Sequence, residues 1–130
     1  MTAEQLRKVD GGVIGHFTPK ECVIDLATAP YNSAVGSNLI GLKVPANKFV
    51  YGAYIKNPAN DLASSGAATI KVTVGSTDVI SATGISDLKG KGVAVLDASP
   101  DYSASEREVK ITTATAVYTA GKVIVGVIYG

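Results

Sequence analysis

Short segments of the chain alternate strictly between apolar and polar side chains. In segment 68–74, the apolar Ile70 and Val72 lie on either side of the polar Lys71. The same period of two returns in segment 108–114. Successive side chains of a β-strand point to opposite faces, so this pattern predicts strands that bury one face and expose the other.

Further strands are predicted where apolar runs lie between turn-forming residues. These runs are 13–18, 21–27, 39–44, 48–57, 77–82, 92–97 and 122–129. Turns are expected at Pro19-Lys20 and at 99–101, and segment 85–92 is expected to be a loop. In strand 48–57 we expect one face to carry Phe49, Tyr51, Ala53 and Ile55. About nine strands without a convincing amphipathic helix predict an all-β fold, a β-sandwich with jelly-roll or Greek-key connections.

The last predicted strand, 122–129, is apolar on both faces. One face carries valines and ends at Tyr129, while the other carries Ile124 and Ile128 around Gly126. Such a strand lies either in the centre of a sandwich or in a subunit interface. We therefore take Ile124, Ile128 and Tyr129 as candidate residues of an oligomer interface.

Segment 1–12 lies outside the strand pattern. Thr2 and Gln5 have the spacing of a capping box, and Gly11 and Gly12 end any helix that begins there. This segment is predicted to be a short helix or a polar arm that orders on a partner, and the alternative is a frayed terminus. The expected organisation is an arm, 1–12, followed by a sandwich domain, 13–130.

The amino-acid composition indicates which classes of binding partner to expect. The hydrophobic fraction is 46% and the charged fraction 18%, which predicts a folded domain with apolar surface left for a partner. Twelve basic and eleven acidic residues give a net charge of +1, and there is no Trp, so we expect no nucleic-acid partner. The N-terminus lacks the apolar run of a signal peptide and no run is long enough to span a bilayer, so synthesis in a cytoplasm and no membrane partner are expected.

The sequence offers little for catalysis. His16 and Cys22 are the single histidine and the single cysteine. They lie on two adjacent predicted strands, yet no residue pattern supplies the group that a Cys–His dyad needs to orient its imidazole. Segment 97–101 lacks the glycine and closing Glu of an EF-hand, and segment 87–92 lacks the spacing of a phosphate-binding loop. We expect no enzyme activity, no metal site and no cofactor.

Segment 39–130 resembles the small β-sandwich proteins of tailed-bacteriophage virions, the capsid decoration (cement) and head-fibre proteins. The likeness is carried by Val-Pro-Ala-Asn-Lys at 44–48 before a long strand, by the hairpin 70–80 and by the ending 120–129. The resemblance implies a homotrimer that lies on the exterior of the capsid and has no catalytic site. It also implies binding to the major capsid protein through one end or an N-terminal arm. We take that arm to be segment 1–12, with the candidate attachment residues Thr2, Glu4, Gln5, Leu6 and Arg7.

A carbohydrate-binding or adhesin-like module is the alternative function. Tyrosines on the surface stack on sugar rings, and the candidates here are Tyr31, Tyr51, Tyr54, Tyr102 and Tyr118. The absence of Trp and of a calcium loop argues against this function. Head-fibre proteins combine both roles, so host-surface glycans remain a candidate partner beside the capsid.

Overall fold

The computed structural model describes residues 18–130, which form ten strands and one short helix. The elements are β1 (Thr18–Asp25), β2 (Gly36–Val44), β3 (Lys48–Lys56), β4 (Ala63–Ser64), β5 (Thr69–Val74), β6 (Thr77–Gly84), α2 (Ile85–Leu88), β7 (Gly92–Ser103), β8 (Arg107–Ala114), β9 (Tyr118–Ala120) and β10 (Lys122–Tyr129).

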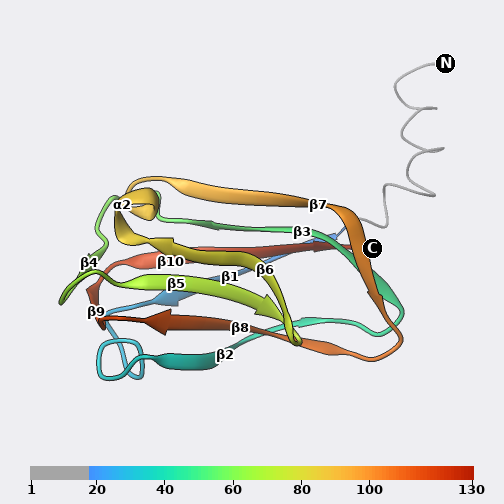
Figure 1. The fold of residues 1–130 in the computed structure, drawn as a ribbon, viewed down its shortest axis with the longest axis horizontal. Helices are drawn as coiled ribbons and strands as arrows, with labels where there is room; N and C mark the ends of the chain where they lie inside the picture. Colours follow the sequence, from blue (N-terminus) through green and yellow to red (C-terminus); the bar gives the residue numbers. More distant parts are fainter. Residues whose placement is uncertain (1–17) are drawn as a thin grey trace, which may run out of the picture.

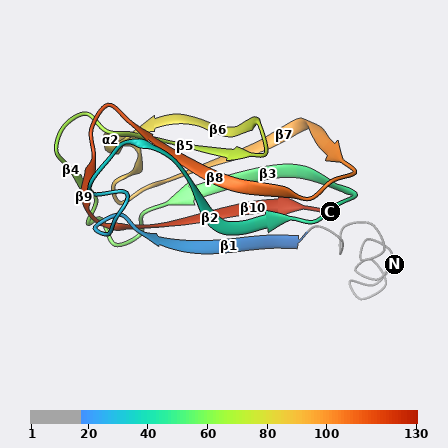
Figure 2. The same ribbon diagram turned by 90° about the horizontal axis from the view of Figure 1, so that it is seen from below.

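Eight of these strands form two antiparallel sheets that face each other (Figures 1 and 2). The terminal sheet, which holds the first and last strands, has the order β1-β10-β3-β7, and the hairpin sheet has the order β2-β8-β5-β6. Strands β4 and β9 form a small separate sheet at one end. The predicted β-sandwich is therefore confirmed.

The connectivity is that of a jelly roll. The first strand pairs with the last, β2 pairs with β8, β3 with β7, and β5 with β6. Between consecutive members of these eight strands, the chain crosses from one sheet to the other, except at the β5–β6 hairpin. A nested hairpin folded over in this way produces the two Greek keys of a jelly roll.

The core lies between the sheets and follows the predicted alternation. Ile70 and Val72 of β5 are fully buried, as is Ile111 of β8. The valines of β10 at 123, 125 and 127 are buried as well. The alternating segments thus bury the face that the sequence predicts.

The two turns expected at Pro19-Lys20 and at 99–101 are wrong. Pro19 and Lys20 lie inside β1, which is an edge strand. A proline is tolerated in an edge strand because one side of the strand has no neighbour that needs its missing N–H group. Residues 99–101 lie inside β7, which pairs with β3 up to Leu96 and again from Asp101. Between these points the Asp97 side chain accepts a hydrogen bond from the Ser99 N–H, 2.8 Å away. The turn-forming residues at 99–101 therefore interrupt the β3–β7 hydrogen-bond ladder, but the chain continues in the same direction.

The expected common face of strand 48–57 is also wrong. Relative to β10, β3 contains an extra residue between Val50 and Gly52, because these two residues are opposite the consecutive Tyr129 and Ile128. Val50 is 3% exposed and lies in the core, whereas its neighbour Phe49 is 41% exposed. Beyond the shift, Ala53 and Ile55 are buried. A β-bulge of this kind exchanges the inward and outward positions, so Phe49 and Ala53 point to opposite sides.

The predicted loop 85–92 contains one helical turn, α2, whose Leu88 is fully buried. Residues 13–17 of the predicted strand 13–18 lie outside the described residues, as does the whole predicted arm.

Candidate assembly surface

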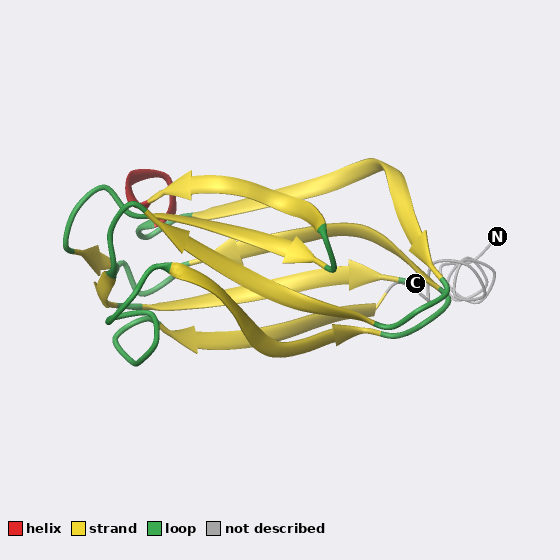
Figure 3. Ribbon diagram, turned by 60° about the horizontal axis from the view of Figure 1, so that its bottom comes forward, coloured by secondary structure: helices red, strands yellow, loops and turns green. Residues whose placement is uncertain are grey.

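One end of the sandwich gathers segments that are far apart in the sequence (Figure 3). Thr18 is in register with Tyr129, next to the C-terminus. Phe49 and Gly130 exchange two backbone hydrogen bonds of 2.9 and 3.0 Å. The N–H of Asn47 donates to the carbonyl of Ser103 at 2.8 Å, which joins the β2–β3 and β7–β8 connections. We call this the terminus end.

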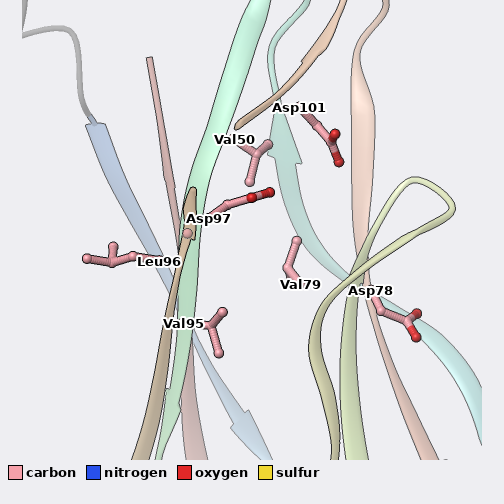
Figure 4. A pocket seen from close by; sticks show the side chains of 8 residues that line it. Val50, Asp78, Val79, Val95, Leu96, Asp97 and Asp101 are labelled. Atoms are coloured by element: carbon pink, nitrogen blue, oxygen red, sulfur yellow. The ribbon is translucent and has the colours of Figure 1, made fainter. Parts of the chain in front are cut away.

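The outward face of the terminal sheet is apolar near this end. Because the valines of β10 point inward, Ile128 points outward, and the strand register places Pro19 on one side of it and Gly52 on the other. Gly52 is in turn opposite Leu96. One row across four strands therefore carries no charged residue. Leu96 is 78% exposed, and its side chain points away from the core (Figure 4).

An aromatic cluster extends this apolar row. Phe49 is in register with Tyr102, and their ring centroids are 5.1 Å apart. The centroid of the Tyr51 ring lies 6.1 Å from that of Phe49. The Tyr102 hydroxyl donates to the Asn47 side-chain oxygen at 2.9 Å, although the residue is 53% exposed. These contacts hold the exposed aromatic side chains in place.

The charged residues of the same face lie toward the opposite end. The Tyr54 hydroxyl donates to the Glu21 carboxylate. The Lys56 ammonium lies 3.9 Å from Glu21 and 5.5 Å from the centroid of the Tyr54 ring. Burial, and next the hydrogen bond to Glu21, raise the pKa of Tyr54 to about 12. The Glu21 carboxylate thus has both a hydrogen-bond donor and a cation beside it within the face.

The outward face of the hairpin sheet is different in character. It carries hydroxyl pairs such as Ser37 and Thr112, whose oxygens are 2.7 Å apart. It also carries the ion pair Lys71–Asp78, with a nitrogen–oxygen distance of 3.5 Å. Leu39, 53% exposed, is a large apolar side chain on this polar face, in register with Lys110. Of the two sheet faces, the terminal sheet presents the apolar one.

The structure separates the three residues predicted for an oligomer interface. Ile124 and Ile128 are half-buried on the outward face of the terminal sheet. Tyr129 is only 5% exposed and packs inside the sandwich. The predicted attachment residues Thr2, Glu4, Gln5, Leu6 and Arg7 lie outside the described residues, as does His16.

Sequence reasoning missed the most exposed apolar side chains of this face. They are Leu96, Val23, Tyr102 and Phe49. Phe49 was expected to share one face with Ala53 and Ile55, because the bulge in β3 leaves no mark in the hydrophobic pattern. Leu96 lies in a fully apolar run, Val-Ala-Val-Leu at 93–96, in which alternation is invisible.

Two of the tyrosines expected on the surface are buried. Tyr118 is fully buried and Tyr31 is 9% exposed. The Tyr118 N–H donates to the Tyr31 carbonyl at 3.3 Å. Sugar stacking through these two residues is therefore excluded, because an aromatic platform must be open to the ligand. Tyr51 and Tyr54 are half-buried, and Tyr102 remains as an exposed ring.

The chemistry-bearing residues of the described part form no reactive set. The Cys22 thiol donates to the Ile40 carbonyl at 3.2 Å, and burial raises the pKa of the thiol, which disfavours the reactive thiolate. Among residues 18–130, no three His, Cys, Asp or Glu side chains are placed to bind a metal ion. No helix in this range has the length and apolar character to cross a membrane.

A pocket of about 260 Å³ opens between the free edges of β6 and β7 (Figure 4). Its apolar wall includes Val50 and Val79, and its acidic residues are Asp78, Asp97 and Asp101. The interruption in the β3–β7 ladder lies beside this pocket, because Asp97 follows the last paired residue of the first stretch.

Comparison with known proteins supports the fold from another direction. No family model and no curated protein matches the sequence. A chain in the acid-stable capsid structure of Helicobacter pylori bacteriophage KHP30 has a TM-score of 0.57 and 12% identity, over 87% of this chain and 86% of that one. A chain in the capsid of Ralstonia phage GP4 has a TM-score of 0.55 and 24% identity, over 88% and 83%. A chain of the cyanophage Pam1 capsid has a TM-score of 0.57 and 18% identity, over 87% and 83%. At these identities the likeness establishes a shared fold.

Proposed function

We propose that the protein is a structural component of a tailed-phage virion, a homotrimeric decoration or head-fibre protein on the capsid exterior. The main support is that three phage-capsid structures contain a chain with this fold, matched over most of both chains. The sequence resemblance in segment 39–130 points to the same group. The proposed partners are the major capsid protein and further copies of this chain, and the proposed role involves no catalysis.

The physical role would be to stabilise the assembled shell. A rigid trimer that bridges neighbouring capsid subunits binds the assembled state and not the separated subunits, so it shifts the equilibrium toward the shell. Repeated weak contacts add up through multivalency. A jelly roll suits this role because its two packed sheets resist deformation.

Attachment is proposed to run through segment 1–12, with Thr2, Glu4, Gln5, Leu6 and Arg7 as contacts. The described sandwich begins with Thr18 at the terminus end, beside Pro19 and Ile128. This start point supports the proposal, because the chain before Thr18 joins the sandwich at the terminus end. Ile124 and Ile128 are the proposed contacts between copies.

Co-sedimentation with empty, undecorated capsids of the phage that encodes this chain tests the proposal. The full chain is expected to sediment with the capsids and to raise their temperature of disruption. The truncated chain 13–130 is expected to keep its circular dichroism spectrum and to lose capsid binding. Failure of the full chain to bind would overturn the proposal, and full binding by the truncated chain would overturn the role of the arm.

Glycan binding is the second candidate function, and the exposed pair Phe49 and Tyr102 favours it. Two neighbouring aromatic rings on the surface of a sheet, tilted by 53° to each other, offer a contact for the apolar face of a sugar. A glycan array with the wild-type protein and Tyr102→Ala tests this function. Binding that Tyr102→Ala abolishes supports it, whereas an array without signal rejects it.

A further inference from the structure

We propose that the outward face of the terminal sheet packs against a second copy of this chain, with its charge-free half at the centre of the contact. This inference rests on the proposed function, in which copies of the chain associate, and it names the surface through which they do so. The charge-free half is the set Pro19, Phe49, Leu96, Tyr102 and Ile128.

The first argument is exposure. Leu96, Tyr102 and Phe49 of the charge-free half are 78%, 53% and 41% exposed on one side of one sheet. Single exposed apolar residues are common, but a contiguous patch on a small domain marks a surface that meets a partner. The hairpin sheet provides the internal comparison, because its outward face carries a hydroxyl pair and an ion pair and exposes Leu39 as a large apolar side chain.

The second argument is charge, and it selects a second copy over other partners. The terminal-sheet face carries two acidic residues, Glu21 and Asp25, and two basic residues, Lys56 and Lys122. Glu21 is paired with Lys56 at 3.9 Å, and Asp25 is in register with Lys122. The face therefore has no net charge with which to select an acidic or a basic partner. Its best complement is another neutral apolar surface, and of the two sheet faces of residues 18–130 the terminal-sheet face of another copy is the better match. In a trimer the three copies of this face meet around the symmetry axis, each beside its two neighbours.

The third argument is size. Four strands about 4.8 Å apart, each about eight residues long at about 3.3 Å per residue, present a flat footprint of roughly 500 Å². Projecting side chains make the accessible surface larger than this footprint. A standard interface buries about 800 Å² on each partner. The whole face thus matches one side of a standard interface, whereas a small peptide would cover only a strip of it.

The centre of the face is also preorganised. Phe49 is fixed by its two backbone bonds to Gly130, and Tyr102 by its bond to Asn47. Gly52 leaves no side chain between Ile128 and Leu96, because an added Cβ would collide with the Val95 carbonyl. Gly52 therefore lets β7 and the Leu96 side chain pack closely over β3. Rigid aromatic side chains are typical of the centre of an interface, since little entropy is lost on binding.

The experiment compares matched leucines on the two sheets. Leu96→Asp places a charge in the proposed contact, and Leu39→Asp places the same charge on the hairpin-sheet face, where the leucine is 53% exposed. Leu96→Ser is the milder second variant. Light scattering over a dilution series measures the oligomer, and thermal unfolding checks that each variant folds.

We expect the wild type and Leu39→Asp to be oligomers of equal stability toward dilution. Leu96→Asp is expected to weaken association by about 30-fold or more, the loss typical of an interface hot spot. Oligomers that survive both Leu96 variants would overturn this inference and leave the proposed trimer intact. A wild type that stays monomeric overturns self-association itself. If that monomer binds capsids and Leu96→Asp does not, the occupant of the face is the capsid and not a second copy.

Discussion

The aromatic ring of Tyr54 lies directly over Gly126 on the neighbouring strand, in the place where a side chain of any other residue would stand. The two residues are in register on β3 and β10, and a Cβ added to Gly126 would overlap the ring. This position brings the Tyr54 hydroxyl to Glu21 on the far side of β10. A glycine in the last strand therefore lets a side chain of β3 span the central strand and reach β1.

Gly126→Ala is predicted to destabilise the protein by about 1–3 kcal/mol, the usual cost of overpacking. The methyl group forces the ring to rotate, and the hydrogen bond to Glu21 is lost with the rotation. Urea unfolding measures the effect. The control is Gly84→Ala, where the nearest atom to an added Cβ is 3.9 Å away. Equal stability of the two variants would contradict the proposed contact.

Tyr54 is predicted to titrate well above an ordinary tyrosine. Its pKa is raised to about 12 by burial and by its bond to Glu21, so folding favours the protonated phenol. The stability that this phenol contributes is complete below pH 10 and is lost as the pH rises from 10 to about 12. Ultraviolet absorbance of wild type and Tyr54→Phe follows the titration. The difference between the two curves is expected near pH 12, and a difference centred at pH 10 would contradict the environment described.

Asn57 is predicted to be essential for the end of the sandwich opposite the terminus end. It is fully buried, and its amide nitrogen donates to the Asp61 carboxylate and to the Lys122 carbonyl, both at 2.7 Å. Its side-chain oxygen accepts from the Gly90 N–H at 3.1 Å. Asn57→Ala leaves these partners unsatisfied and is expected to cost about 2–4 kcal/mol in unfolding free energy. The control Asn32→Ala removes one exposed bond, and a comparable loss there would contradict the role of burial.

Much of this fold follows from the sequence, and the exceptions have identifiable physical causes. Strand β10 was predicted with its observed limits, because turn residues directly precede it and its alternating valines continue to the end of the strand. The inward and outward positions of β3 were wrong at Phe49, since a bulge changes the side of every residue before it without altering composition. The apolar face was predicted through Ile124 and Ile128 alone. Leu96 and Tyr102 join them only through the register of four strands, which depends on long-range pairing.

Asp61 is predicted to make the protein less stable in acid. The hydrogen bond from Asn57 is the main cause that holds the pKa of Asp61 below its usual value of 3.8. A carboxyl group whose pKa is lower in the folded state stabilises the fold above the unfolded pKa, and this contribution is lost as the pH falls through the folded value. Unfolding of wild type and Asp61→Asn should therefore differ at pH 6 and converge as the pH falls through the folded-state pKa of Asp61, which lies below 3.8. In an Asn57→Ala background the same comparison should give a smaller pH dependence, because the amide donor is gone. A pH dependence unchanged by Asn57→Ala would show that another group sets the pKa of Asp61.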